Sequence, residues 1–103
     1  MATLIVTLSH AFPNIIGQIY ADVAVGAGAR SEAITMPGAG TMVAAAGETI
    51  VVLLADADCW VAVGPDPDTS ADGGGVRSAW PVPAGAPYPL LVAPGDTIAV
   101  ETR

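Results

Sequence analysis

The residues of this chain with the clearest potential for chemistry lie in one acidic loop. Asp66, Asp68, Ser70 and Asp72 place an oxygen-bearing side chain at every second position, as the first ligands of a calcium loop do. A calcium loop also needs a glycine at its sixth position and a bidentate glutamate at its twelfth, and neither follows here. Such a composition is equally typical of a solvated loop. We therefore expect no cofactor and no metal requirement for folding, while cation binding by this loop stays open.

The remaining reactive residue types form no catalytic pattern. Asp56 and Asp58 flank a tight turn, where hydrogen bonds to nearby backbone N–H groups explain them better than acid–base chemistry. His10 is the only histidine and Cys59 the only cysteine, and no signature of a nucleophilic enzyme surrounds either. The glycine run 73–75 lacks the lysine of a phosphate-binding loop. We expect no catalytic, cofactor or metal residues and no enzymatic activity.

Composition narrows the classes of partner. The chain has 103 residues, ten Asp and Glu against three arginines, no lysine and a net charge of −7. This charge disfavours nucleic acid and anionic membranes, which bind through Lys and Arg. The first residues lack the basic region of a secretory signal, and no apolar run reaches the ~20 residues that cross a bilayer. We expect a protein made in the cytoplasm that binds neither nucleic acid nor membrane.

Alternating apolar and polar residues predict short strands. The pattern is clear over 3–8, 18–25, 32–36 and 58–63, and 49–55 is a continuous apolar run typical of a central strand covered on both faces. Twelve glycines and nine prolines interrupt the chain, and no helical period appears. These features predict an all-β fold. We expect one domain over 1–103, an antiparallel β-sandwich or jelly roll of seven to eight short strands.

Turn sequences suggest how these strands connect. Only Asp56 and Ala57 separate the strands 49–55 and 58–63, a length that suits a hairpin. The strands 88–92 and 97–101 form a second expected pair, joined by the turn 93–96. Residues 76–82 are expected to form an edge strand because Pro81 lacks an N–H donor. Residues 9–14, which include Pro13, are expected to form a loop.

The same patterns predict core and interface residues. The expected core contains the apolar residues Leu4, Val6, Val23, Val51, Leu53, Val61, Leu91 and Ile98. Trp60 and Trp80 are interface candidates because tryptophan is enriched in subunit contacts. Filling the core is the favoured alternative for Trp60, whereas Trp80 is evenly balanced between the two roles. Leu4 and Val6 are further interface candidates, since residues 1–30 could include an arm that reaches a neighbouring subunit.

The second half of the chain resembles small β-rich proteins of tailed bacteriophages. The similarity runs from Gly47 to Val100 and includes ADADCWVAVGPDP at 55–67, VPAGAPYPLLV at 82–92 and APGDTIAV at 93–100. Many proteins of this appearance are capsid decoration, or cement, proteins. The resemblance implies a structural protein on the surface of a phage capsid, bound to the major capsid protein and to itself as a homotrimer. It implies no functional residues.

Two alternatives to a decoration protein remain open: another component of the virion, and a carbohydrate-binding or small enzymatic jelly-roll domain. A head-fibre, tail or adaptor component of the virion would share the same sandwich. A carbohydrate-binding jelly-roll module would expose aromatic side chains on a concave face, and a metal-dependent jelly-roll enzyme would need several histidines. The single histidine and five aromatic residues weigh against these last two classes.

Overall fold

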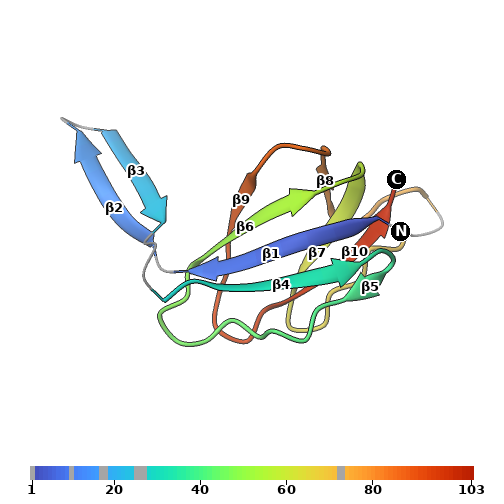
Figure 1. Cartoon of the computed structure of the whole chain (residues 1–103), viewed down its shortest axis with the longest axis horizontal. Helices are drawn as coiled ribbons and strands as arrows, with labels where there is room; N and C mark the ends of the chain where they lie inside the picture. The colour runs from blue at the N-terminus through green and yellow to red at the C-terminus, as the bar shows by residue number, and fades with distance from the viewer. Residues whose placement is uncertain (1, 10, 17–18, 25–27, 72–73) are drawn as a thin grey trace.

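The chain forms two packed four-stranded β-sheets and a two-stranded hairpin that projects from one end (Figure 1). This computed structural model describes residues 2–9, 11–16, 19–24, 28–71 and 74–103, with the backbone alone for 11–16 and 19–24. None of these residues lies in a helix, so the described chain contains no helix able to cross a membrane. The expected antiparallel β-sandwich is confirmed.

The first sheet has the strand order β4-β1-β6-β9, all antiparallel. Its strands are β4 (Arg30–Thr35), β1 (Thr3–Ser9), β6 (Ile50–Ala55) and β9 (Tyr88–Leu91). Strand β1 is central, with Leu8 opposite both Arg30 and Val51. The alternating residues that predict β1 match its environment in the structure: one face of the strand enters the core and the other faces outward.

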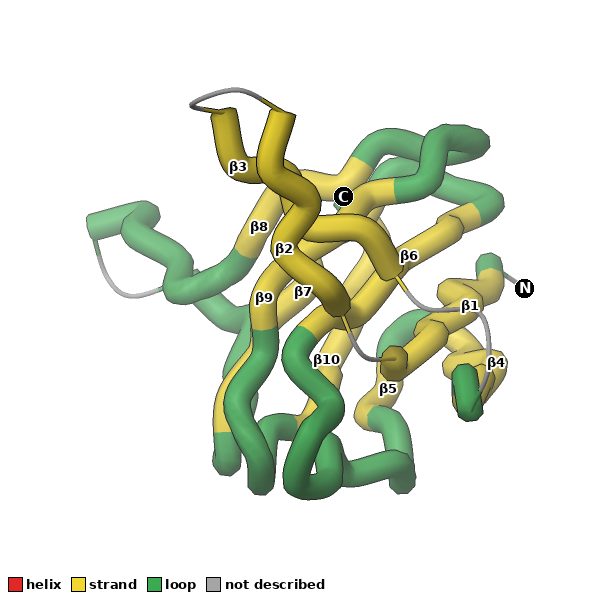
Figure 2. The backbone as a smooth tube through the Cα atoms, turned by 90° about the vertical axis from the view of Figure 1, so that its left-hand side faces the viewer, coloured by secondary structure: helices red, strands yellow, loops and turns green. Residues whose placement is uncertain are grey.

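The second sheet has the order β5-β10-β7-β8 and packs against the first, as the view from the hairpin end shows (Figure 2). It contains β5 (Gly38–Ala39), β10 (Thr97–Thr102), β7 (Cys59–Gly64) and β8 (Trp80–Val82). Strand β8 pairs only with β7 among the described strands, so the expected edge position is confirmed. The strand covers only Trp80–Val82 and not the expected 76–82. Its proline, Pro81, lies where the missing N–H donor can face away from the ladder.

The hairpin consists of β2 (Ala11–Ile16) and β3 (Ile19–Ala24). The expected loop over 9–14 is therefore wrong. Pro13 lies in β2 opposite Asp22, and an isolated two-stranded ribbon accepts it because each strand has a free edge. Among the described elements, β2 and β3 contact each other extensively and no other strand to a similar degree. The molecule measures 44 Å along its longest axis against 27 and 26 Å across, and the hairpin extends along that axis (Figure 1).

Two expected strand pairs are also wrong, because the short turns between them cross from one sheet to the other. Strand β6 belongs to the first sheet and β7 to the second, although only three residues separate them. The turn 93–96 likewise carries the chain from β9 to β10 in the opposite sheet. The pairs that form instead are β6 with β9 and β7 with β10. A short turn can therefore connect strands of two different sheets as well as two strands that pair in a hairpin.

Two carboxylates fasten the long segment between β5 and β6. Glu32 of β4 accepts hydrogen bonds from the backbone N–H groups of Thr41 and Met42, each at 3.0 Å. Glu48 is buried, pairs with Arg30 and accepts the Ala45 N–H at 2.8 Å. This segment therefore closes one edge of the sandwich without regular secondary structure.

The core lies between the two sheets. Its largest fully buried side chains are Leu4, Leu53, Val6, Val51, Val61, Val82, Val100 and Cys59. Of the eight expected core residues, six are buried and the side chain of Val23 lies outside the described part. Leu91 is the error: it is 70% exposed, since β9 turns Tyr88 and Leu90 toward the core instead. Leu54 is 42% exposed, so β6 is not covered on both faces as expected.

Candidate functional site

The outer surface of the first sheet carries no charged side chain. Cross-strand registers place Ile5 beside Ala33 and Leu54, and Val52 beside Thr7 and Pro89. The outward positions that are at least partly exposed are Thr3, Ile5, Thr7, Ser31, Ala33, Thr35, Val52, Leu54, Pro89 and Leu91. We call these ten residues the uncharged face. In a chain of net charge −7, an open sheet surface normally carries charged residues, which favour solubility and oppose association.

The chemistry of the uncharged face suits burial against another surface. Ile5 and Leu54 are 39% and 42% exposed, and Leu91 is exposed further along the sheet. The hydroxyl groups of Thr7 and Ser31 hydrogen-bond each other at 2.8 Å. Polar groups that are already paired lose little when water is removed, whereas unpaired polar groups are costly to bury. The uncharged face therefore combines exposed apolar side chains with one pair of hydroxyls that bond each other.

A shallow groove of about 420 Å³ lies at one end of the uncharged face. Its apolar walls come from Ile5, Leu54 and Ala55, with Thr3, Asp56 and Gly85 completing the lining. The Asp56 carboxylate accepts the Thr3 N–H at 2.7 Å, so this charge is engaged with the backbone of the groove wall. The groove could accommodate apolar side chains from a partner.

The outer surface of the second sheet is different, because the chain covers it with its own residues. Arg77, from the loop after β7, lies over the Trp60 ring with 5.0 Å between guanidinium carbon and ring centroid. Arg77 also pairs with Glu101 of β10 and donates to the Thr69 carbonyl at 2.7 Å. On the same outward side of β7, Ala62 is only 2% exposed. Trp60 thus supports an intramolecular contact.

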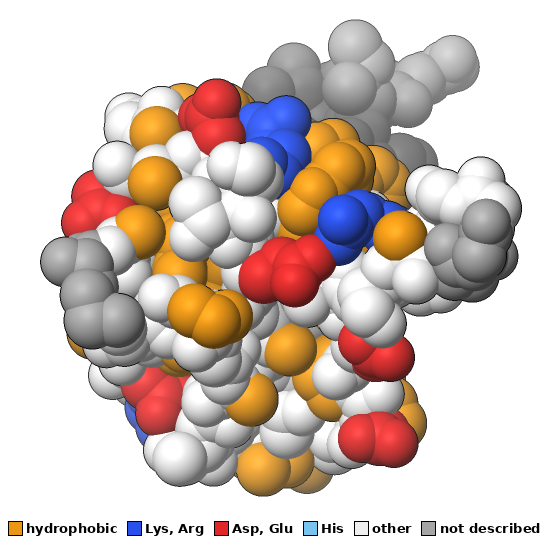
Figure 3. All heavy atoms as spheres, turned by 90° about the vertical axis from the view of Figure 1, so that its right-hand side faces the viewer, with side chains coloured by type: hydrophobic (Ala, Val, Ile, Leu, Met, Phe, Trp, Pro, Cys, Tyr) orange, Lys and Arg blue, Asp and Glu red, His pale blue; other side chains and the backbone are white. Residues whose placement is uncertain are grey.

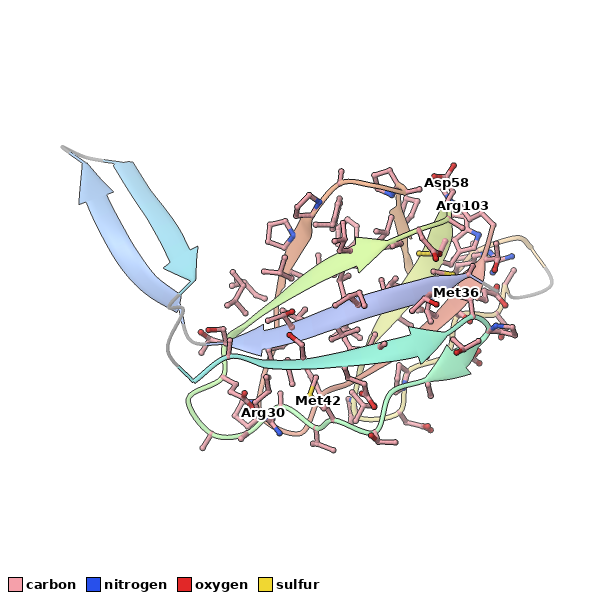
Figure 4. All side chains as sticks on the ribbon, viewed as in Figure 1. Arg30, Met36, Met42, Asp58 and Arg103 are labelled. Carbon is pink, nitrogen blue, oxygen red and sulfur yellow. The ribbon has the colours of Figure 1, made fainter. Side chains whose placement is uncertain are left out.

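The tryptophans have distinct environments at the end of the molecule that holds both termini. Arg103 also approaches the Trp60 ring, at 5.7 Å, and lies 3.8 Å from the Asp58 carboxylate (Figure 4). Figure 3 shows this end, where Arg and Asp or Glu side chains gather beside hydrophobic surface. Trp80 lies on the edge strand and is 53% exposed. Trp80 therefore remains a predicted interface residue. Trp60 does not fill the core as favoured from the sequence, because it lies partly exposed on the outer side of β7 with two guanidinium groups near its ring.

Leu4 and Val6 are not interface residues. They are 0% and 1% exposed and belong to the core of the sandwich. The reason is the position of β1, which lies between β4 and β6 and turns these two side chains toward the opposite sheet. The alternation over 3–8 places Thr3, Ile5 and Thr7 on the other side of the strand, and that side is the more exposed one.

The residues with potential for catalysis have structural surroundings. The Asp58 carboxylate accepts the Ala84 N–H at 2.9 Å, so both turn aspartates bond backbone groups, but in distant parts of the chain rather than in their own turn. Cys59 is fully buried beside the Val82 carbonyl, with 3.9 Å between sulfur and oxygen. Burial raises the pKa of the Cys59 thiol, which opposes formation of a nucleophilic thiolate. His10 lies outside the described residues.

The acidic loop has local hydrogen bonding in its described part. The Asp68 carboxylate accepts the Ser70 N–H at 2.9 Å and the Ser70 hydroxyl at 2.7 Å, and these bonds lower the pKa of Asp68. This is the pattern of an aspartate that stabilises its own turn. In the part of the chain that the structure describes, no three His, Cys, Asp or Glu residues group as metal ligands would. Asp72 lies outside that part.

Comparison with known proteins adds no relative. No family model, no curated protein and no solved structure matches this chain.

Proposed function

We propose that this chain is a structural virion protein that decorates and stabilises a bacteriophage capsid. In this proposal it acts by burying surface against other subunits and not by chemistry. The observation that carries the structural role is the uncharged face, which exposes Ile5, Leu54 and Leu91 on an acidic protein. The assignment to a phage capsid rests on the resemblance of residues 47–100 to phage decoration proteins.

Surface chemistry supports docking over the alternative of carbohydrate binding. Sugar-binding surfaces typically stack aromatic rings against the ligand, whereas none of the ten residues of the uncharged face is aromatic. Protein interfaces have a core depleted in charged residues, and the uncharged face has this composition. A partner that brings apolar side chains is the better match.

A capsid presents many identical sites, so each subunit can attach through modest contacts when several subunits act together. The proposal therefore includes self-association, and a homotrimer bound to the major capsid protein is the form that the phage resemblance implies. Stabilisation follows because a ligand that binds only the assembled shell shifts the equilibrium away from the disrupted state.

The test is the abundance of this chain in purified particles and the consequence of its removal. We expect a copy number comparable to that of the major capsid protein. Particles made without the chain should assemble but rupture at lower temperature, and added purified protein should restore their resistance. A copy number far below that of the capsid protein would favour a head-fibre, tail or adaptor position. Unchanged resistance together with no rebinding would contradict the cement role.

A further inference from the structure

The hairpin and the groove lie at opposite ends of the same sheet. The chain leaves the sheet for the hairpin after Ser9, the last residue of β1, and returns at Arg30, the first residue of β4. The groove lies around Thr3 and Leu54, at the other end of β1. Six residue steps separate Thr3 from Ser9, or about 20 Å of strand. The hairpin also extends away from its own sandwich (Figure 1), so its own groove is out of its reach.

The hairpin lacks the packing that normally stabilises two strands. A hairpin of two strands is marginal in water unless a third strand or another element covers one of its faces. No other described element contacts β2 and β3 extensively. Its sequence is nevertheless rich in large apolar residues, namely Phe12, Ile15, Ile16, Ile19, Tyr20 and Val23. A segment of this composition is expected to gain stability by burial against a partner.

Charge makes a second copy of this chain a suitable partner. The strands β2 and β3 contain one charged residue, Asp22, and the uncharged face contains none. Two copies of a protein with net charge −7 repel each other over most of their surfaces. Contact between the hairpin and the uncharged face keeps this repulsion low, because it brings few carboxylates together: Asp22 from the hairpin and, at the groove, Asp56, which is engaged with the Thr3 N–H.

We propose that the β2–β3 hairpin of one copy docks on the uncharged face of a second copy, joining subunits head to tail. This inference rests on the proposed role of the uncharged face as a docking surface. Each subunit then uses two surfaces, its hairpin for one neighbour and its uncharged face for another. A head-to-tail contact closes into a ring when the rotation between subunits permits, and a three-membered ring is the homotrimer expected above.

Head-to-tail docking gives each subunit two contacts, whereas direct packing of two uncharged faces gives it one. A stable interface of standard size buries about 800 Å² per partner, and the uncharged face is confined to the four strands of one sheet. The two contacts of a ring use the hairpin surface that direct packing of two faces would leave exposed.

The test is a complementation experiment with two variants of the whole chain. The face variant is Leu54→Lys, which places a charge at the groove. The hairpin variant replaces residues 10–28 with Asn-Gly, a two-residue turn that suits the antiparallel strands β1 and β4, in which Leu8 lies opposite Arg30. Val76→Lys is the matched control, because Val76 is 66% exposed and lies outside the first sheet. Protection of the Cys59 thiol reports that each variant is folded.

Sedimentation velocity at micromolar concentration gives the readout. We expect the unaltered chain and Val76→Lys to form the same oligomer, and each of the other two variants to be monomeric. Mixing those two should produce a one-to-one heterodimer, since one supplies an intact hairpin and the other an intact face.

Three outcomes would overturn the inference. If the hairpin variant forms the same oligomer as the unaltered chain, the hairpin is not the occupant, although a monomeric face variant would still support the uncharged face as a docking surface. If the mixture of folded variants stays monomeric, head-to-tail docking is wrong. If the unaltered chain is itself monomeric, the occupant belongs to another protein, and the capsid role stays open to the particle experiments above.

Discussion

Ile5 of β1 and Leu54 of β6 are cross-strand partners whose side chains lie on the outside of the sandwich, 39% and 42% exposed. The residue before Leu54 has the opposite environment, since Leu53 is fully buried between the sheets. Two adjacent leucines of one strand therefore serve different purposes. Leu53 stabilises the fold, whereas Leu54 is available for a partner.

The different burial of Leu53 and Leu54 predicts that their substitution has different effects on the free energy of unfolding. Leu53→Ala should lower the free energy of unfolding by about 2–5 kcal/mol, because it removes buried methyl groups and leaves a cavity. Leu54→Ala should change it by less than about 1 kcal/mol, as surface substitutions usually do. Chemical denaturation at a concentration where the protein is monomeric measures both. Similar losses for the two variants would contradict the assignment of Leu54 to the outer surface.

The Cys59 thiol should be protected from reagents in the folded protein. It is 0% exposed, and its raised pKa keeps it protonated at neutral pH. We expect reaction with a thiol reagent such as dithionitrobenzoate to occur only as fast as the protein unfolds, and to become rapid in denaturant. Rapid reaction under native conditions would show that β7 does not pack as described.

Glu32 should make stability depend on pH in the acidic range. Hydrogen bonds from the Thr41 hydroxyl and the Thr41 and Met42 N–H groups lower its pKa below the ordinary value of 4.5. The unfolded state therefore takes up this proton first as the pH falls, so the stability from Glu32 is fully present above about pH 4.5 and is lost as the pH falls through the lowered pKa.

The corresponding variant is Glu32→Gln, which should be less stable than the unaltered chain at pH 6 and approach its stability as the pH falls through the lowered pKa of Glu32. Asp68→Asn is the control for a second carboxylate of lowered pKa, whose hydrogen bonds among the described residues go to Ser70 of its own loop. Thermal unfolding across this range measures both. If the difference in stability between Glu32→Gln and the unaltered chain does not shrink as the pH falls, the charge of Glu32 is not its cause.

Arg77 should stabilise the protein through its contact with Trp60. Arg77→Ala removes the guanidinium over the ring, the pair with Glu101 and the bond to the Thr69 carbonyl, which we expect to cost about 1–2 kcal/mol. In a Trp80→Phe background, which leaves Trp60 as the only tryptophan, the same change should increase fluorescence quenching by acrylamide. Unchanged quenching would contradict coverage of Trp60 by the loop.

The sequence predicts strands better than their partners. The alternation of Leu4, Val6 and Leu8 suffices to predict β1, because side-chain period is a local property of a strand. Whether β7 pairs with β6 or with β10 depends on contacts far apart in the chain, and the turn at Asp56 permits both. The wrong prediction that Leu91 is buried has the same origin. The face on which Leu91 lies follows from its pairing with Ile50 of β6, and the sequence alone does not give this pairing.

The sequence predicts which residues of β1 share a face, but it does not predict the four-stranded surface to which that face belongs. The pattern around Ile5 indicates which residues share a face of β1, yet the uncharged face comes from four strands that are not consecutive in the chain. Its absence of charge becomes apparent only when the registers place Ala33 and Val52 beside β1, and Pro89 beside Val52. The interface candidates Leu4 and Val6 were on the right strand but on its buried side.

The most direct measurement of the central claim is labelling of a thiol placed on the uncharged face. In Leu54→Cys, the native Cys59 is expected to stay unreactive, so the label reports the new position alone. Val76→Cys provides a matched thiol away from the first sheet. We predict that Leu54→Cys reacts rapidly in the dilute monomer and is strongly protected in the oligomer or on the particle, whereas Val76→Cys reacts equally in all states. Equal reactivity of Leu54→Cys in monomer and assembly would contradict the claim that the uncharged face is the docking surface.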